Sequence, residues 1–133
     1  MRRTIRAVAS VGLVLFLAGC EDGSGPDRPG TAVVSLVTPN NNDGAVAVTL
    51  RGVAFSDVEA ASSAYRVYWL LASADEVRVI VVGNIIAGPL FTVQLSNIGR
   101  IDDVEAAVTD AATRTDAARD NLTGYSVTLG AGN

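Results

Sequence analysis

Short valine-rich runs, each ended by Gly, Pro or Asn, are the feature that most constrains the fold of this chain. Most of these runs alternate apolar with polar or small residues, which is the two-residue period of a strand with one buried face. No pattern of alternating strand and helix joins them, so the sequence predicts an all-β fold, a small antiparallel Greek-key β-sandwich. About seven strands are expected, over residues 32–38, 45–51, 64–72, 77–82, 90–95, 103–109 and 125–129.

The segment Asn40–Gly44 is rich in residues that favour turns, and a hairpin between 32–38 and 45–51 is its simplest interpretation. Its side-chain oxygens also suggest a calcium loop. However, Asp43 is its only carboxylate, and Leu50 stands where an EF-hand loop needs Glu. The sequence therefore favours a turn, and no metal site is predicted.

Residues 101–122 allow two interpretations. Apolar and small residues recur there at spacings of three and four, which is typical of an amphipathic helix, so a short helix is possible. Val104, Ala106 and Val108 also alternate as in a strand, and several Thr residues weaken a helix. The favoured interpretation is a strand over 103–109 followed by an irregular loop over 110–121.

In the third predicted strand, Tyr65, Tyr68 and Trp69 fall within five residues. Because successive side chains point to opposite faces of a strand, the three rings cannot all face inward. We expect Trp69 in the core and Tyr68 outside, where its ring could stack on a sugar or on an apolar patch of a partner. Tyr68 is therefore a candidate binding residue.

The N-terminal segment has the organisation of a secretory signal. Arg2, Arg3 and Arg6 precede an apolar run over 7–18 that is too short to span a bilayer. The run ends in Leu17-Ala18-Gly19-Cys20, which resembles the lipobox of bacterial lipoproteins. The resemblance implies cleavage before Cys20 and lipidation of its thiol, with palmitate among the expected acyl chains. The mature protein would then be held in the cell envelope by its lipid, in the outer or the inner membrane.

These features divide the chain into a signal peptide (1–19), a lipidated Cys with a flexible acidic tether (20–30) and a sandwich domain (31–133). After cleavage at residue 20, seven Arg and fourteen acidic residues remain, for a net charge of −7. Such a surface repels phosphate backbones, so nucleic acid is not expected as a partner.

Three glycine-led strand entries, Gly44–Val48, Gly88–Val93 and Gly124–Leu129, resemble those of cohesin-like bacterial sandwiches. The resemblance implies a fold that recurs in secreted proteins which bind dockerin modules or carbohydrate. The run Leu122–Tyr125 also resembles a tyrosine corner, in which the Tyr hydroxyl bonds a backbone group a few residues upstream.

The composition restricts the chemistry available to the protein. There is no His, all ten basic residues are Arg, and the single Cys excludes an internal disulfide. Ser and Thr therefore lack the His or Lys that usually activates them, so no enzyme activity and no cofactor are predicted. The densest acidic group, Asp102, Asp103 and Glu105, is expected to consist of solvated charges, although with Asp110 it could surround a divalent cation.

The function predicted from sequence is a non-catalytic binding module, anchored through the lipid on Cys20, for an envelope protein or a glycan. One alternative is a structural or assembly lipoprotein that contributes a free edge strand at 32–38 or 125–129 to a larger complex. Another is a weak carrier of a divalent cation or small ligand.

Overall fold

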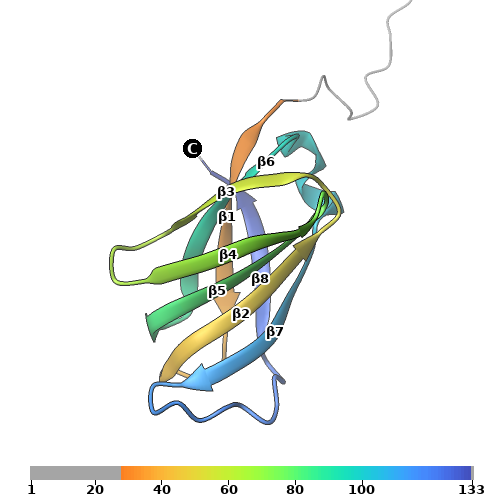
Figure 1. Cartoon of the computed structure of the whole chain (residues 1–133). Coiled ribbons are helices and arrows are strands. Elements are labelled where there is room, and N and C mark those ends of the chain that lie inside the picture. Colours follow the sequence, from red (N-terminus) through yellow and green to blue (C-terminus); the bar gives the residue numbers. More distant parts are fainter. Residues whose placement is uncertain (1–27, 133) are drawn as a thin grey trace, which may run out of the picture.

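A computed structural model describes residues 28–132, and these form two four-stranded antiparallel sheets that face each other (Figure 1). The all-β sandwich is therefore confirmed, with eight strands in place of about seven. The elements are β1 (Gly30–Val37), β2 (Asp43–Arg51), β3 (Phe55–Ala60), β4 (Arg66–Ser73), β5 (Glu76–Ile85), β6 (Gly88–Leu95), the 3-10 helix η1 (Ile98–Asp103), β7 (Glu105–Thr113) and β8 (Ser126–Ala131). The lipobox, Cys20 and most of the tether lie outside the described residues.

One sheet has the strand order β3-β6-β1-β8 and the other has the order β4-β5-β2-β7. The chain folds back on itself in nested pairs, since β4 pairs with β5, β3 with β6, β2 with β7, and β1 with β8. This nested pairing is typical of jelly-roll sandwiches, which are built from Greek keys. It places β1 beside β8, so the two ends of the described chain lie at the same end of the molecule (Figure 1).

The predicted hairpin between the first two strands is wrong. β1 pairs with β6 and β8, whereas β2 belongs to the other sheet and pairs with β5 and β7. The segment between them, which includes Pro39, carries the chain from one sheet to the other. Both strands do alternate, and their apolar residues point into the same core. The two strands nevertheless belong to different sheets.

The core lies between the two sheets and consists of the side chains that point inward from each alternating strand. Because this side of the strands is almost entirely Val, Leu, Ile and Phe, burial of each side chain stabilises the fold by about 1.5–3 kcal/mol. The largest fully buried side chains are Val34, Val46, Val48, Leu50, Val77, Val79, Val81, Ile85, Leu90, Phe91, Val93 and Leu95.

The favoured interpretation of residues 101–122, a strand followed by an irregular loop, is confirmed, although the bounds of the strand differ. β7 continues to Thr113, and the chain from 114 to 125 is irregular apart from an isolated bridge at Ala118. The 3-10 helix η1 overlaps only the first residues of this region. Within residues 28–132, no helix combines the length and apolar character needed to cross a membrane.

β3 has no counterpart among the predicted strands. Its two buried side chains, Phe55 and Val58, are three residues apart, which breaks the two-residue period. The break is a β-bulge between Ser56 and Val58, where Asp57 adopts a φ of 44°.

Candidate functional site

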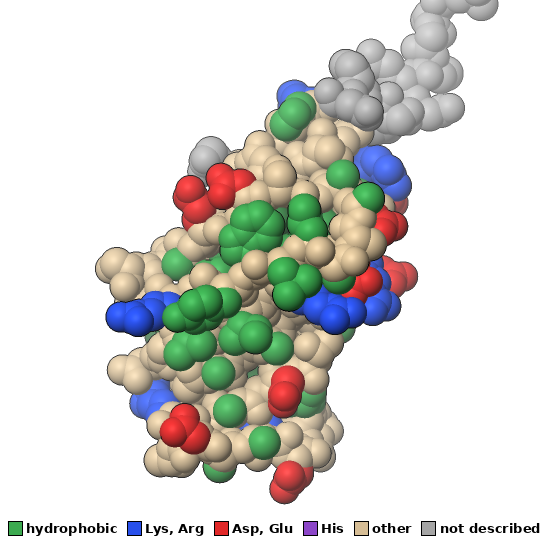
Figure 2. All heavy atoms as spheres, in the orientation of Figure 1, with side chains coloured by type: hydrophobic (Ala, Val, Ile, Leu, Met, Phe, Trp, Pro, Cys, Tyr) green, Lys and Arg blue, Asp and Glu red, His purple; other side chains and the backbone are tan. Residues whose placement is uncertain are grey.

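The outer part of β4 and β5 exposes large apolar side chains. Tyr68, Trp69, Leu70 and Leu71 of β4 are 58, 40, 56 and 49% exposed, and Ile80 and Val82 of β5 are also exposed. Tyr68, Leu70, Ile80 and Val82 point to the outer face of the sheet, whereas Trp69 and Leu71 point to its inner side at the edge; we call these six residues together the β4–β5 surface. Figure 2 shows hydrophobic side chains gathered over the two strands, with basic side chains at one end and a mixture of basic and acidic side chains at the other. Monomeric proteins rarely expose a large contiguous apolar patch without a use for it.

Tyr68 lies outside as expected, but the prediction that Trp69 is a core residue is wrong. Trp69 does point to the inner side of its sheet, because it is opposite Val79, which is fully buried. However, β4 is the edge strand, and the strand with which it is in contact in the other sheet, β3, is only six residues long. The opposing sheet therefore covers the inner side chains of β5 fully and leaves those of β4 half exposed.

The charges around the β4–β5 surface are mostly basic. Arg66 lies at the start of β4 and, among residues 28–132, has no ion-pair partner. At the other end, Arg78 and Arg51 both contact Glu76, at 3.2 and 3.4 Å. Aromatic, aliphatic and Arg side chains grouped in this way are typical of the central residues of protein interfaces.

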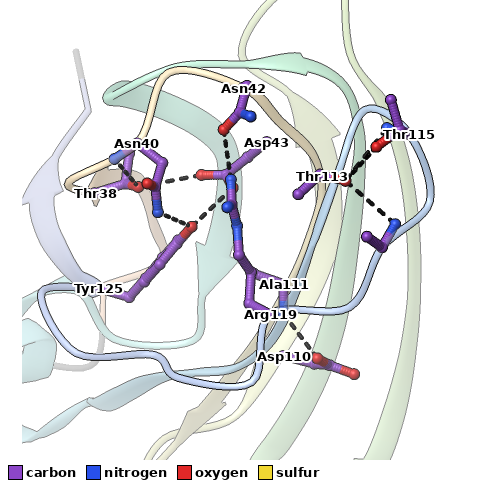
Figure 3. Close-up of polar contacts among 11 residues, drawn as sticks. Thr38, Asn40, Asn42, Asp43, Asp110, Ala111, Thr113, Thr115, Arg119 and Tyr125 are labelled. Carbon is purple, nitrogen blue, oxygen red and sulfur yellow. Dashed lines mark hydrogen bonds and ion pairs between the residues drawn. The ribbon is translucent and has the colours of Figure 1, made fainter.

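A second group of side chains surrounds Asp43, the first residue of β2, whose side chain is fully buried (Figure 3). One carboxylate oxygen, Oδ1, accepts hydrogen bonds from Tyr125 Oη at 2.7 Å and from Arg119 Nη2 and Nε at 2.8 and 3.1 Å. The other, Oδ2, accepts a hydrogen bond from Thr38 Oγ1 at 3.1 Å. Within the described residues, no buried side-chain polar atom lacks a partner.

Two asparagines complete this group. Asn40 Nδ2 donates to Tyr125 Oη at 2.8 Å, and Arg119 Nη2 donates to Asn42 Oδ1 at 2.6 Å. We call Thr38, Asn40, Asn42, Asp43, Arg119 and Tyr125 the Asp43 network. The hydrogen bond with Asp43 raises the pKa of the Arg119 guanidinium above its ordinary value. Since that pKa is raised, the stabilisation by the charged guanidinium is complete below the ordinary Arg pKa and is lost only at more alkaline pH.

The Asp43 network joins the two sheets at one end of the sandwich. Thr38 follows β1 and Tyr125 precedes β8, whereas Asp43 begins β2 and Arg119 follows β7. Gly44 allows this close packing, because a Cβ at that position would lie 2.8 Å from the backbone of Arg114. Both carboxylate oxygens of Asp43 accept hydrogen bonds from this chain. The network therefore acts as a structural connection between the β1–β2 segment and the β7–β8 loop.

The expected tyrosine corner is not formed. The hydroxyl of Tyr125 donates to the side chain of Asp43, 82 residues earlier, and not to a backbone group a few residues upstream. Sequence reasoning also missed Arg119, which lies 76 residues from Asp43 and belongs to no local motif.

The acidic residues considered for a cation do not form one group. Asp103 forms an ion pair with Arg100 at 3.0 Å, and Asp110 accepts a hydrogen bond from the backbone of Ala111. Glu105 and Asp110 lie opposite Arg51 and Ala47 of β2, well apart along β7. Among residues 28–132, no three Asp, Glu, Cys or His side chains are close enough together to hold a metal ion.

Comparison with known proteins gave no match to a protein-family model, a curated protein or a solved structure.

Proposed function

We propose that this protein is a lipid-anchored, non-catalytic interaction module of the cell envelope, and that it binds another protein through the β4–β5 surface. The observation that carries this proposal is the exposure of Tyr68, Trp69, Leu70 and Leu71 on one edge strand. Burial of such side chains in an interface provides most of the binding free energy of typical complexes.

The composition of the surface favours a protein partner over a glycan. Aromatic rings can stack on sugars, but a sugar also needs hydrogen-bonding groups for its hydroxyls. On the same face, Ile80 lies opposite Tyr68, Leu70 and Val82 lie nearby, and Arg66 and Arg78 flank this aliphatic group. These side chains match the apolar centre of a protein interface.

The lipid anchor is supported by the sequence Leu17-Ala18-Gly19-Cys20 and by the polar segment that follows it. β1 begins at Gly30, so a chain anchored at Cys20 would enter the sandwich at the end opposite the Asp43 network (Figure 1). The β4–β5 surface lies on a side of the sandwich and remains accessible in this arrangement.

Replacement of Tyr68 by a photo-crosslinking phenylalanine derivative tests the binding role in intact cells of the source organism. Irradiation is expected to give a crosslinked protein adduct that is lost when Leu70→Glu is added. The same derivative at Thr128, on the outward side of β8, is the matched control. Absence of an adduct at position 68, or an equal adduct at both positions, would contradict the proposal.

Cys20→Ser tests the anchor separately. The variant is expected to fold normally, to lose labelled palmitate and to move from the membrane fraction to the soluble fraction. Wild-type protein that takes up no palmitate and stays soluble would show that the lipobox prediction is wrong.

A further inference from the structure

The sandwich has four edge strands, and three of them are protected against pairing with another strand. β3 is short, bulged and carries Asp57 and Glu59. The free side of β7 is covered by its own following loop, since Arg119 N donates to Ala111 O and Thr113 N donates to Ala117 O, both at 2.9 Å. Short strands, bulges, charges and covering loops are the usual devices that prevent edge-to-edge association.

The third protected edge, β8, is also short, and its most exposed residues are small or polar. These are Ser126, Thr128, Gly130 and Ala131. The expected free edge at residues 32–38 does not exist, because β1 is paired on both sides. The expected edge at residues 125–129 does exist, but it offers little apolar surface.

β4 has none of these protections. It is eight residues long, pairs within the described chain only with β5, and contains the six consecutive apolar residues Val67–Ala72. Its register with β5 is regular from Arg66 to Leu71. Its only charged residue is Arg66, and it contains neither Pro nor Lys nor an acidic residue. The free edge of β4 is therefore suited to pair with another strand, and its side chains on both faces are suited to contact apolar side chains of that strand.

We infer that β4 pairs antiparallel with β4 of a second copy of this chain, so that the two four-stranded sheets join into one continuous sheet. The inference rests on the proposed function, in which the β4–β5 surface binds a protein, and it names that protein. A two-fold axis perpendicular to the sheet would relate the copies, which is the symmetry of most homodimers.

The sequence of β4 is complementary to itself in this arrangement. With the axis at Leu70, each Trp69 lies opposite Leu71 of the other copy, and each Tyr68 lies opposite the small Ala72. Directly opposite residues of an antiparallel pair are on the same face, so apolar side chains meet apolar side chains on both faces.

The charges also agree with this pairing. Each Arg66 would approach the β4–β5 turn of the other copy, which carries Asp75 and Glu76. No like charges are opposite each other along the strand. This matters because the net charge of −7 expected after cleavage would otherwise repel a second copy, and β4 is a strand free of acidic residues.

The symmetry is compatible with two lipid anchors in one bilayer. The axis places the starts of the two β1 strands on opposite sides of the dimer. Both tethers can reach the same membrane when the axis is normal to it, because ten tether residues span up to about 35 Å.

Cysteine crosslinking tests the register directly, because Cys20→Ser leaves the chain without any cysteine. Leu70→Cys added to that chain is expected to form a disulfide-linked dimer under mild oxidation, since opposite Cα atoms in an antiparallel pair are about 4.5–5.5 Å apart, within disulfide range. A mixture of Tyr68→Cys and Ala72→Cys chains is expected to crosslink more than either chain alone. Thr128→Cys is the matched exposed control. Equal crosslinking at positions 70 and 128 would overturn the inference.

Sedimentation equilibrium of the Cys20→Ser chain provides the second test. We expect a monomer–dimer equilibrium, with a blue shift of the emission of Trp69, the only Trp of the chain, as the dimer forms. Leu70→Lys places like charges on the two-fold axis and is expected to weaken the dimer by more than about tenfold, whereas Thr128→Lys leaves it unchanged. Circular dichroism checks that both variants fold.

A chain that stays monomeric at every accessible concentration would overturn the inference. If the photo-crosslinked partner at position 68 is then a different protein, the proposed function stands and only the second copy is excluded. If neither a dimer nor an adduct forms, the proposed function fails as well.

Discussion

The Asp43 network and the β4–β5 surface reverse the usual distribution of polar and apolar side chains. The network places a carboxylate where no solvent reaches it, and the surface places a Trp, a Tyr and several aliphatic residues in water. The polar group is stable because, within the described residues, every buried side-chain polar atom has a hydrogen-bond partner. The apolar group has no such covering in residues 28–132. The network is therefore complete as it stands, whereas the surface is left exposed within the described residues.

Asp43→Ala is expected to give the largest change. It breaks the ion pair between the fully buried Asp43 and the partly buried Arg119 and removes the acceptor of Tyr125, so the free energy of unfolding should fall by about 3–5 kcal/mol. Urea denaturation measures this loss. Asp43→Asn, which keeps the shape of the side chain, should lose less. An unchanged urea midpoint for Asp43→Ala would show that the network does not stabilise the fold.

Tyr125→Phe is expected to have an intermediate effect. It removes one hydrogen bond to the buried carboxylate and leaves Asn40 without its acceptor, which should lower the free energy of unfolding by about 1–3 kcal/mol. Tyr65→Phe, whose hydroxyl makes only a long contact of 3.4 Å with the backbone of Ile86, is the matched control and should be close to neutral. Equal losses for the two variants would contradict a special role of Tyr125.

Tyr68→Ser and Leu70→Ser are expected to have the smallest effect on stability. Both side chains are more than half exposed, so the free energy of unfolding of the monomer, measured at concentrations too low for a dimer, should change by no more than about 0.5 kcal/mol. The same variants should bind less of a dye that detects exposed apolar surface. A large loss of stability would mean that the β4–β5 surface belongs to the core, which would remove the contrast with the Asp43 network.

The strands themselves could be predicted because alternation reports which face of a run is buried. β2 and β5 follow this rule closely, with Val46, Val48 and Leu50 inward on one and Val77, Val79 and Val81 inward on the other. Alternation contains no information about which strand lies alongside. This is why the hairpin between β1 and β2 was predicted and is wrong. β3 escaped prediction because its bulge spaces Phe55 and Val58 by three residues.

The two candidate sites differ in how much of them the sequence could reveal. The exposure of Tyr68 follows from the crowding of three aromatic residues on one strand, so it could be predicted. The exposure of Trp69 depends on β4 being an edge strand that faces the short β3, which is a property of the assembled sandwich. The partnership of Asp43 and Arg119 joins residues 76 positions apart through two loops, and no local pattern indicates it.

The pairing of β1 with β8 determines when the sandwich can fold during synthesis. Ala32 lies opposite Ala131 and Val37 lies opposite Ser126, so among the strands of residues 28–132 the first to be synthesised pairs with the last. Contacts this distant in sequence form slowly, because a long loop must close before they contribute. During synthesis, and during export if the N-terminal signal is used, the chain would stay in an open form until β8 has emerged. The native sandwich would then form in the compartment where the whole domain arrives.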